Sequence, residues 1–215
     1  MIGLIKICLV VLLSIGCEYL TGVNSHGMML EPVSRGSRWR TDRTAPANYD
    51  DNGLYCGGYA VQWSAYAGKC GICGDSYGDK MPRPHEIGGT YGQGVIVGKY
   101  KAGQELDVSI KITQNHKGYF VFQLCNMDSQ PESERCYSDN PVQVKEGGYK
   151  HYLNSDENRF YNTTIILPPK FTCKKCGLRW IYNTGNSWGT CDDGTGAIGC
   201  GPQEQFVNCA DITIS

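Results

Sequence analysis

Residues 104–124 read QELDVSIKITQNHKGYFVFQL, and this stretch indicates the fold class. Its first half alternates four apolar residues with polar neighbours: Leu106, Val108, Ile110 and Ile112. Such a period of two is typical of a strand buried on one face. Residues 119–124 form a second strand-like run, and residues 115–118 between the two runs predict a hairpin turn.

Outward from this stretch, further strands are predicted at residues 94–100, 162–167, 178–183 and 206–214. Amphipathic helices are scarce, and glycine-rich segments connect the strands. The pattern therefore predicts an all-β protein, an antiparallel β-sandwich. Residues 35–94 are instead rich in Gly, Tyr, Pro and Cys, and we expect a long, disulfide-stapled loop region with short helices.

The first 25 residues have the pattern of a secretory signal peptide. Lys6 precedes an apolar run over residues 7–15, and the segment ends in residues with small side chains before His26. We expect cleavage after Ser25, which leaves residues 26–215 as a single secreted, extracellular domain. No later segment has the ~20 apolar residues of a membrane helix, so no membrane partner is expected.

Charge and cysteine content limit the classes of function. The formal net charge is −1, and no basic patch favours nucleic acid. Of the twelve cysteines, Cys8 and Cys17 lie in the signal segment. The other ten, in an exported chain, predict up to five disulfides whose pairing stays open. A sequon at Asn162 predicts glycosylation.

Two of the four histidines are candidate metal ligands. Cleavage after Ser25 would give His26 two metal-binding nitrogens, its α-amine and its ring, although a mobile polar terminus is the alternative. His116 follows a strongly patterned strand, which would give a ligand a rigid mount. A solvated turn residue is the alternative for His116.

The remaining histidines and the paired cysteines are expected to be structural. His85 lies between prolines and Glu86, and we expect it to hydrogen-bond to a carbonyl or to Glu86. His151 is expected at the surface. The pairs Cys70–Cys73 and Cys173–Cys176 could bind zinc inside a cell, but their wide separation and export favour disulfides.

Several blocks of the sequence together resemble a known family. They are residues 26–35 (HGMMLEPVSR), 48–58 (NYDDNGLYCGG), 68–75 (GKCGICGD), 83–86 (RPHE), 115–120 (NHKGYF), 186–189 (NSWG) and 199–206 (GCGPQEQF). This ordered set is similar to the animal lytic polysaccharide monooxygenases of auxiliary-activity family fifteen, and the likeness spans nearly all of residues 26–215.

The resemblance implies an immunoglobulin-like β-sandwich that carries one copper ion in a histidine brace. The implied copper ligands are the His26 amine, the His26 ring and the His116 ring. The axial position maps to Phe206, where many members have tyrosine; phenylalanine cannot ligate, although related bacterial enzymes use it. Phe206 could also be simply core. Glu204 matches a carboxylate or amide that orients bound oxygen species, and a surface glutamate is its alternative.

The implied activity is copper-dependent oxidative cleavage of glycosidic bonds in crystalline polysaccharide, chitin or cellulose. It requires an external electron donor and O2 or H2O2, and we expect a monomer. Aromatic rings suit sugar faces, and the candidates in the loop region are Tyr49, Tyr55, Tyr59, Trp63, Tyr66 and Tyr77. The alternative function is a non-enzymatic secreted module that binds chitin or forms a matrix.

Overall fold

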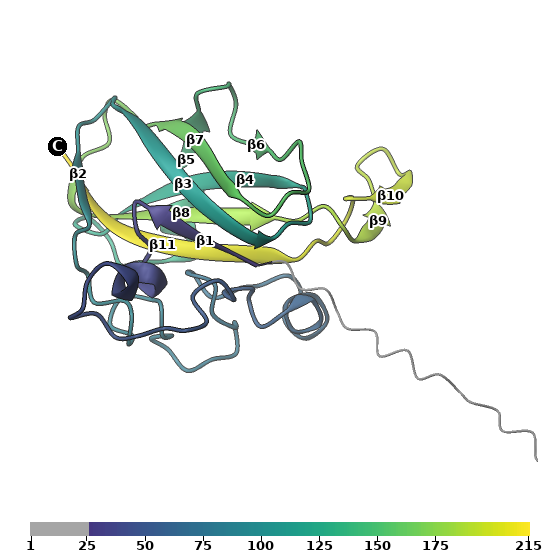
Figure 1. Cartoon of the computed structure of the whole chain (residues 1–215), viewed down its shortest axis with the longest axis horizontal. Coiled ribbons are helices and arrows are strands. Elements are labelled where there is room, and N and C mark those ends of the chain that lie inside the picture. The colour runs from purple at the N-terminus through teal and green to yellow at the C-terminus, as the bar shows by residue number, and fades with distance from the viewer. Residues whose placement is uncertain (1–25) are drawn as a thin grey trace, which may run out of the picture.

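The computed structural model describes residues 26–215; the predicted signal peptide, residues 1–25, lies outside the described residues. Strands make up most of the regular secondary structure (Figure 1). The strands are β1 (His26–Glu31), β2 (Gly98–Tyr100), β3 (Glu105–Gln114), β4 (Tyr119–Asn126), β5 (Pro141–Val144), β6 (His151–Tyr152), β7 (Phe160–Ile166), β8 (Cys173–Asn183), β9 (Trp188–Thr190), β10 (Gly196–Ile198) and β11 (Gln205–Ile214). The short helices are η1 (Arg35–Arg40), η2 (Ala60–Ala65) and α1 (Glu134–Ser138). Among the described residues, no helix has the length and hydrophobicity of a membrane span.

The strands form a curled, immunoglobulin-like β-sandwich, as predicted. One layer has the order β1-β3-β7-β5 and the other has β4-β8-β11-β2, with β6 beside β4. Strand β5 pairs with both β7 and β4, so the two layers join along that edge. One pairing departs from the antiparallel prediction, because β2 runs parallel to β11.

The predicted hairpin between residues 104–113 and 119–124 is wrong. Strand β3 pairs with β1 and β7, whereas β4 pairs with β5, β6 and β8. Residues 115–118 therefore cross from one layer to the other. A hairpin would place the apolar faces of both strands side by side in one sheet, whereas the crossing lets Ile112 and Phe120 join one core between the layers.

The alternation in β3 positions its side chains as predicted. Residues 106, 108, 110 and 112 are at most 5% exposed and meet the buried face of β4 in the core. Strand β11 is buried on both faces, because Phe206, Ala210 and Ile212 face this core and its other face is covered by the loop region.

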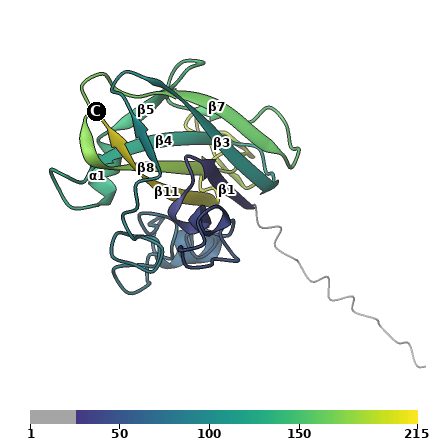
Figure 2. The same cartoon turned by 60° about the vertical axis from the view of Figure 1, so that its left-hand side comes forward.

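The loop region of residues 35–94 lies along β11 and β1, as both views show (Figures 1 and 2). Arg35 forms a paired hydrogen bond with Asp211 on β11, at 2.9 and 2.7 Å. The Cys73–Cys209 disulfide ties the same face of β11 to the loop region. The predicted short helices are present as η1 and η2.

All ten cysteines among the described residues are in disulfides, which confirms the predicted framework. The pairs are Cys56–Cys70, Cys73–Cys209, Cys125–Cys136, Cys173–Cys176 and Cys191–Cys200. The zinc alternative is therefore wrong, since a metal-binding cysteine must be a thiolate. Asn162, on β7, is exposed, and its glycosylation stays a prediction.

Candidate functional site

Five strand ends meet at one end of the sandwich. In the register, His26 at the start of β1 lies opposite Gln114 at the end of β3. In the other layer, Tyr182 near the end of β8 lies opposite Phe120 on β4 and Phe206 on β11. Residues that are far apart in the sequence are therefore neighbours here.

His26 lies half-buried between aromatic rings. Its ring centroid is 6.5 Å from that of Tyr55 and 6.2 Å from that of Phe206. Its carbonyl accepts a long hydrogen bond from the Thr113 hydroxyl, at 3.4 Å. The next residue, Gly27, donates its N–H to the carbonyl of Asn52 at 3.1 Å. The start of β1 is thus held by both β3 and the loop region.

His116 is fixed by the crossing turn and by the end of β8. Its N–H donates to the Tyr182 hydroxyl at 3.0 Å, and its carbonyl accepts from the N–H of Gly185 at 2.9 Å. Gly118 has a φ of +84°, and a Cβ there would lie 2.0 Å from the Asn183 carbonyl. Only glycine allows this close approach, so the turn holds His116 rigidly and is more than a solvated loop.

The electrostatics of the His116 ring favour its neutral form. Burial lowers the pKa of His116 below its ordinary value, and the nearby charge of His26 lowers it further. The His116 Nδ1 atom lies 2.7 Å from the side-chain amide nitrogen of Asn186. A neutral ring with one engaged nitrogen and a second nitrogen for a ligand bond suits metal coordination.

Phe206 lines the site and also belongs to the core. Its side chain has no exposed surface, and its ring lies 6.0 Å from Tyr55 and 6.0 Å from Tyr182, centroid to centroid. The two interpretations of Phe206, site residue and core residue, are therefore compatible. Beside His26 it presents only carbon and hydrogen, which cannot bind a metal.

Glu204 is 6% exposed, so the alternative of a surface glutamate is wrong. Its carbonyl accepts a hydrogen bond from Thr184 N–H at 3.1 Å. The neighbouring Gln203 holds Ser187 on both sides, accepting from its N–H at 2.9 Å and donating to its carbonyl at 3.0 Å. This places Glu204 in an ordered segment next to the residues that contact His116.

The other two histidines have other partners, although His151 lies opposite Phe120 and stacks on its ring at 5.9 Å, centroid to centroid. His85 is buried and bonds to Asp75 through Nδ1 at 2.7 Å, with Asn48 3.2 Å from Nε2. Its structural role is as predicted, but its partners differ, because Glu86 is engaged by Arg83 instead. His151 is half-buried, on the β6 strand, with Glu146 3.6 Å away.

The aromatic candidates of the loop region divide into half-buried and exposed groups. Tyr55 lies at the site beside His26, and Trp63 donates its indole N–H to the Gln203 carbonyl at 2.8 Å. Tyr66 is half-buried against Tyr77. The exposed rings are Tyr49 (85%), Tyr59 (40%) and Tyr77 (38%).

The sequence interpretation gave no role to the β9–β10 hairpin, which projects beyond the sandwich (Figure 1). It carries two exposed apolar side chains, Trp188 at 68% and Ile198 at 71%. The Cys191–Cys200 disulfide closes it. The only indication in the sequence was the family-like block at residues 186–189, which does not show that a hairpin follows or that it lies next to the site.

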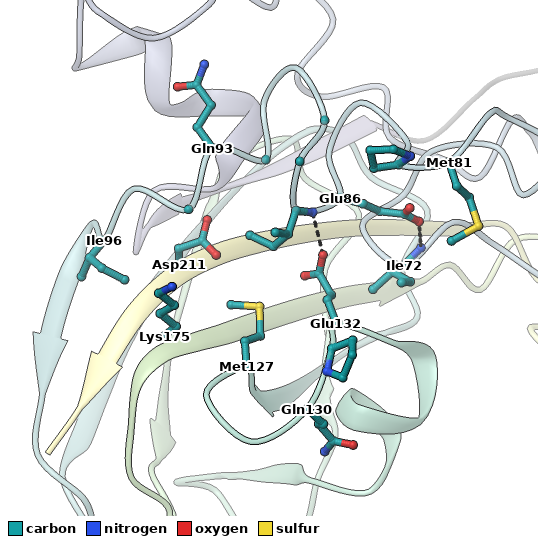
Figure 3. A pocket seen from close by; sticks show the side chains of 17 residues that line it. Ile72, Met81, Glu86, Gln93, Ile96, Met127, Gln130, Glu132, Lys175 and Asp211 are labelled. Atoms are coloured by element: carbon teal, nitrogen blue, oxygen red, sulfur yellow. Dashed lines mark hydrogen bonds between the residues drawn. The ribbon is translucent and has the colours of Figure 1, made fainter.

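A cavity of about 800 Å³ lies elsewhere, between residues 72–96 and residues 127–132 (Figure 3). It includes Asp211, which is about 17 Å along an extended strand from Phe206. Its acidic residues already have partners: Glu132 accepts from Ile87 N–H at 2.8 Å, and Glu86 accepts from Ile72 N–H at 3.2 Å. These bonds hold the loop region together and make the cavity a poor candidate for the chemistry.

Comparisons with known proteins agree with this geometry. The family of lytic polysaccharide mono-oxygenases described as cellulose-degrading matches residues 26–212. A solved lytic polysaccharide monooxygenase AA15 from Thermobia domestica, in the Cu(I) state, is 41% identical, with a TM-score of 0.84, and the match covers 88% of this chain and 98% of that chain. A chitin binding domain from Burkholderia pseudomallei has a TM-score of 0.51 at 10% identity, with 89% and 100% covered, which shows a shared fold alone. Among curated proteins, none matches.

The family match spans nearly every described residue, and the AA15 structure shares both the sandwich and two fifths of its residues with this chain. Five of the seven blocks quoted from the sequence contain a residue of this site: His26, Tyr55, His116, Asn186 and Phe206. The chain belongs to the lytic polysaccharide monooxygenase family.

Proposed function

We propose that His26 and His116 hold one copper ion through three nitrogens: the α-amine and ring of His26 and the ring of His116. As a member of its family, the chain is a copper-dependent enzyme that cleaves polysaccharide oxidatively. The observation that supports these ligands is the register that brings His26 opposite Gln114, two residues before His116.

The donor set fits copper. Imidazole and amine nitrogens are good ligands for copper. Thiolates do not compete, because every cysteine among residues 26–215 is in a disulfide. The neutral form of His116, favoured by burial and by His26, is the form that binds a metal.

The α-amine exists only if the chain is cut before His26. We therefore include cleavage after Ser25 in the proposal, with residues 26–215 as the mature, secreted domain. An α-amine has a pKa of about 8, so a metal displaces only a weakly held proton at neutral pH. Secretion and copper binding are then coupled, because the cleavage step makes one of the three ligands.

A copper ion held by these residues would supply oxidising chemistry towards a carbon of the glycosidic bond, with O2 or H2O2 and an external electron donor. The protein supplies the geometry and excludes water. Phe206 and Tyr55 place aromatic rings beside His26, and the Phe206 ring has no atom that can bind a metal. Glu204, buried next to the Thr184 segment, is proposed to orient the small oxidant.

The substrate that we propose is a crystalline β-1,4-linked polysaccharide, either chitin or cellulose. Such a substrate presents flat sugar faces, which aromatic and apolar side chains bind well. Trp188 and Ile198 offer these groups on a hairpin that begins directly after the His116 contact at Asn186. The two residues lie opposite each other in the β9–β10 pair, and the exposure of both is the reason to assign them to substrate.

The test starts with the ligands. Protein that begins at His26 should bind Cu(II) tightly by titration calorimetry. One extra residue before His26 should weaken binding at least about 100-fold, because the amine becomes an amide. His116→Ala should do the same, whereas His151→Ala should leave affinity unchanged; equal affinities for all four proteins would refute these ligands.

The second arm tests the reaction. Copper-loaded protein is incubated with a reductant and with chitin or cellulose, and the soluble products are analysed by mass spectrometry. Oxidised oligosaccharides from one substrate support the proposal and choose between chitin and cellulose. Binding that survives removal of copper, with no oxidised ends even when H2O2 is fed, would instead support a non-enzymatic chitin-binding module.

A further inference from the structure

The Asn186 side chain is the direct partner of the His116 ring. Its amide nitrogen lies 2.7 Å from His116 Nδ1, and its amide oxygen accepts from the Thr184 hydroxyl at 3.0 Å. Thr184 is only 1% exposed, and its N–H is held by the Glu204 carbonyl. The Thr184 hydroxyl therefore holds one end of the Asn186 amide while the other end contacts the His116 ring.

A neutral imidazole carries one proton, which can sit on either ring nitrogen, and a metal binds the bare one. Because Asn186 occupies Nδ1, Nε2 is the nitrogen available to a metal. An asparagine amide can present either its NH2 or its carbonyl in the same space. If the carbonyl faces Nδ1, it accepts the Nδ1–H, and Nε2 keeps its lone pair.

Turning the amide over costs no hydrogen bond. The NH2 then faces the Thr184 hydroxyl, which can accept as readily as it donates. The orientation drawn in the structure, with the Asn186 NH2 facing Nδ1, would place the ring proton on Nε2 and block the metal. The pair Thr184–Asn186 can therefore select the tautomer of His116 that coordinates a metal, without any change in position.

We propose that Asn186 is a positioning residue that holds His116 in its Nδ1–H tautomer and aims Nε2 at the copper ion. This rests on the proposed copper site. The backbone adds to the hold, because Gly185, the preceding residue, donates its N–H to the His116 carbonyl. Side chain and backbone of one short segment thus orient the ligand, and that segment leads directly into the β9–β10 hairpin.

The test compares two substitutions of similar size. Asn186→Asp keeps an acceptor for Nδ1–H, whereas Asn186→Leu removes it. The tautomer of His116 is read in the metal-free protein from ring 15N chemical shifts, at about pH 8 where the imidazole is neutral. Wild type and Asn186→Asp should show protonated Nδ1, and Asn186→Leu should show a large fraction of protonated Nε2.

Copper affinity is the second readout. Loss of such a ligand partner costs about 10- to 100-fold in metal affinity, so we expect that loss for Asn186→Leu and rescue by Asn186→Asp. Asn154→Leu, at an exposed position outside the site, is the control and should change neither readout. Circular dichroism confirms that each variant is folded.

Two results would overturn the proposal: protonated Nε2 in the wild type, or an unchanged tautomer and affinity in Asn186→Leu. Failure of the copper site itself gives a different result. In that case the wild type binds no copper although its metal-free spectra still show the Asn186-dependent tautomer.

Discussion

At the scale of single residues, the site depends on neutral imidazole. His116 is partly buried, and burial in low dielectric disfavours the charged ring. His26 adds a second positive group nearby, which disfavours it further. Both effects lower the pKa of His116, so the metal-free protein already favours the neutral ring that can bind a metal.

The first prediction concerns this pKa. In the metal-free protein, the His116 ring should titrate below the ordinary histidine value of about 6.5 in an NMR pH titration. His26→Ala should raise this pKa only part of the way, because burial is the larger cause. Since the folded pKa is the lower one, the unfolded chain binds more protons as the pH falls below about 6.5, and His116 then favours unfolding. A pKa at or above the ordinary value would contradict the burial argument.

At the scale of elements, two short connections decide the site. Residues 115–118 cross from one layer to the other and include His116. Residues 184–187 follow β8, and two of them, Gly185 and Asn186, form hydrogen bonds with His116. The β9–β10 hairpin then extends from the same end of the sandwich (Figure 1). Gly196 makes room for the Trp188 ring, because a Cβ there would lie 2.4 Å from an indole carbon.

The second prediction concerns this hairpin. Trp188→Ala should weaken binding to the crystalline polysaccharide by about tenfold, which corresponds to about 1.4 kcal/mol, because an exposed ring that could stack on sugar is lost. Copper affinity should not change, since the ligands and Asn186 remain. Pull-down isotherms with the insoluble substrate measure the effect. Phe160→Ala on β7, 51% exposed, is the matched control; a comparable loss there would show that the effect is not specific to the hairpin.

At the scale of the whole molecule, β11 joins the sandwich to the loop region. Its Asn208 side chain accepts from Met29 N–H at 2.8 Å, and Asp211 holds Arg35. Cys209 adds the disulfide to Cys73, which closes a span of 136 residues. Because Tyr55 and Asn52, which contact His26 and Gly27, belong to the loop region, this attachment also affects the position of the proposed copper ligands.

The third prediction concerns the length of chain that each disulfide closes. A longer closed loop restricts the unfolded chain more, so replacing Cys73 and Cys209 by alanine should lower the free energy of unfolding by about 5 kcal/mol. Replacing Cys191 and Cys200, separated by 9 residues, should cost about 2.5 kcal/mol. Denaturant unfolding of both double variants measures the difference. Equal losses would mean that native contacts, not chain closure, dominate.

Sequence reasoning succeeded where a pattern is local. The period of two in β3 predicted its buried face, and an even number of cysteines in an exported chain predicted the disulfide framework. It failed for β1, whose Met28 and Met29 are both buried and so show no alternation. It also failed for the hairpin at residues 115–118, because local turn chemistry does not reveal whether the next strand stays in the same layer.

The sequence by itself determined the longer strands β3, β4, β7, β8 and β11, the cysteine content and, through a set of family motifs, the choice of His26 and His116 as candidate ligands. Only the tertiary structure decided that Asn186 contacts the His116 ring, that Glu204 is buried and that Trp188 projects beside the site. The physical reason is that side-chain periodicity and turn preference act over a few residues. Contacts between β1, β3, β8 and β11 form only when the two layers close on a common core.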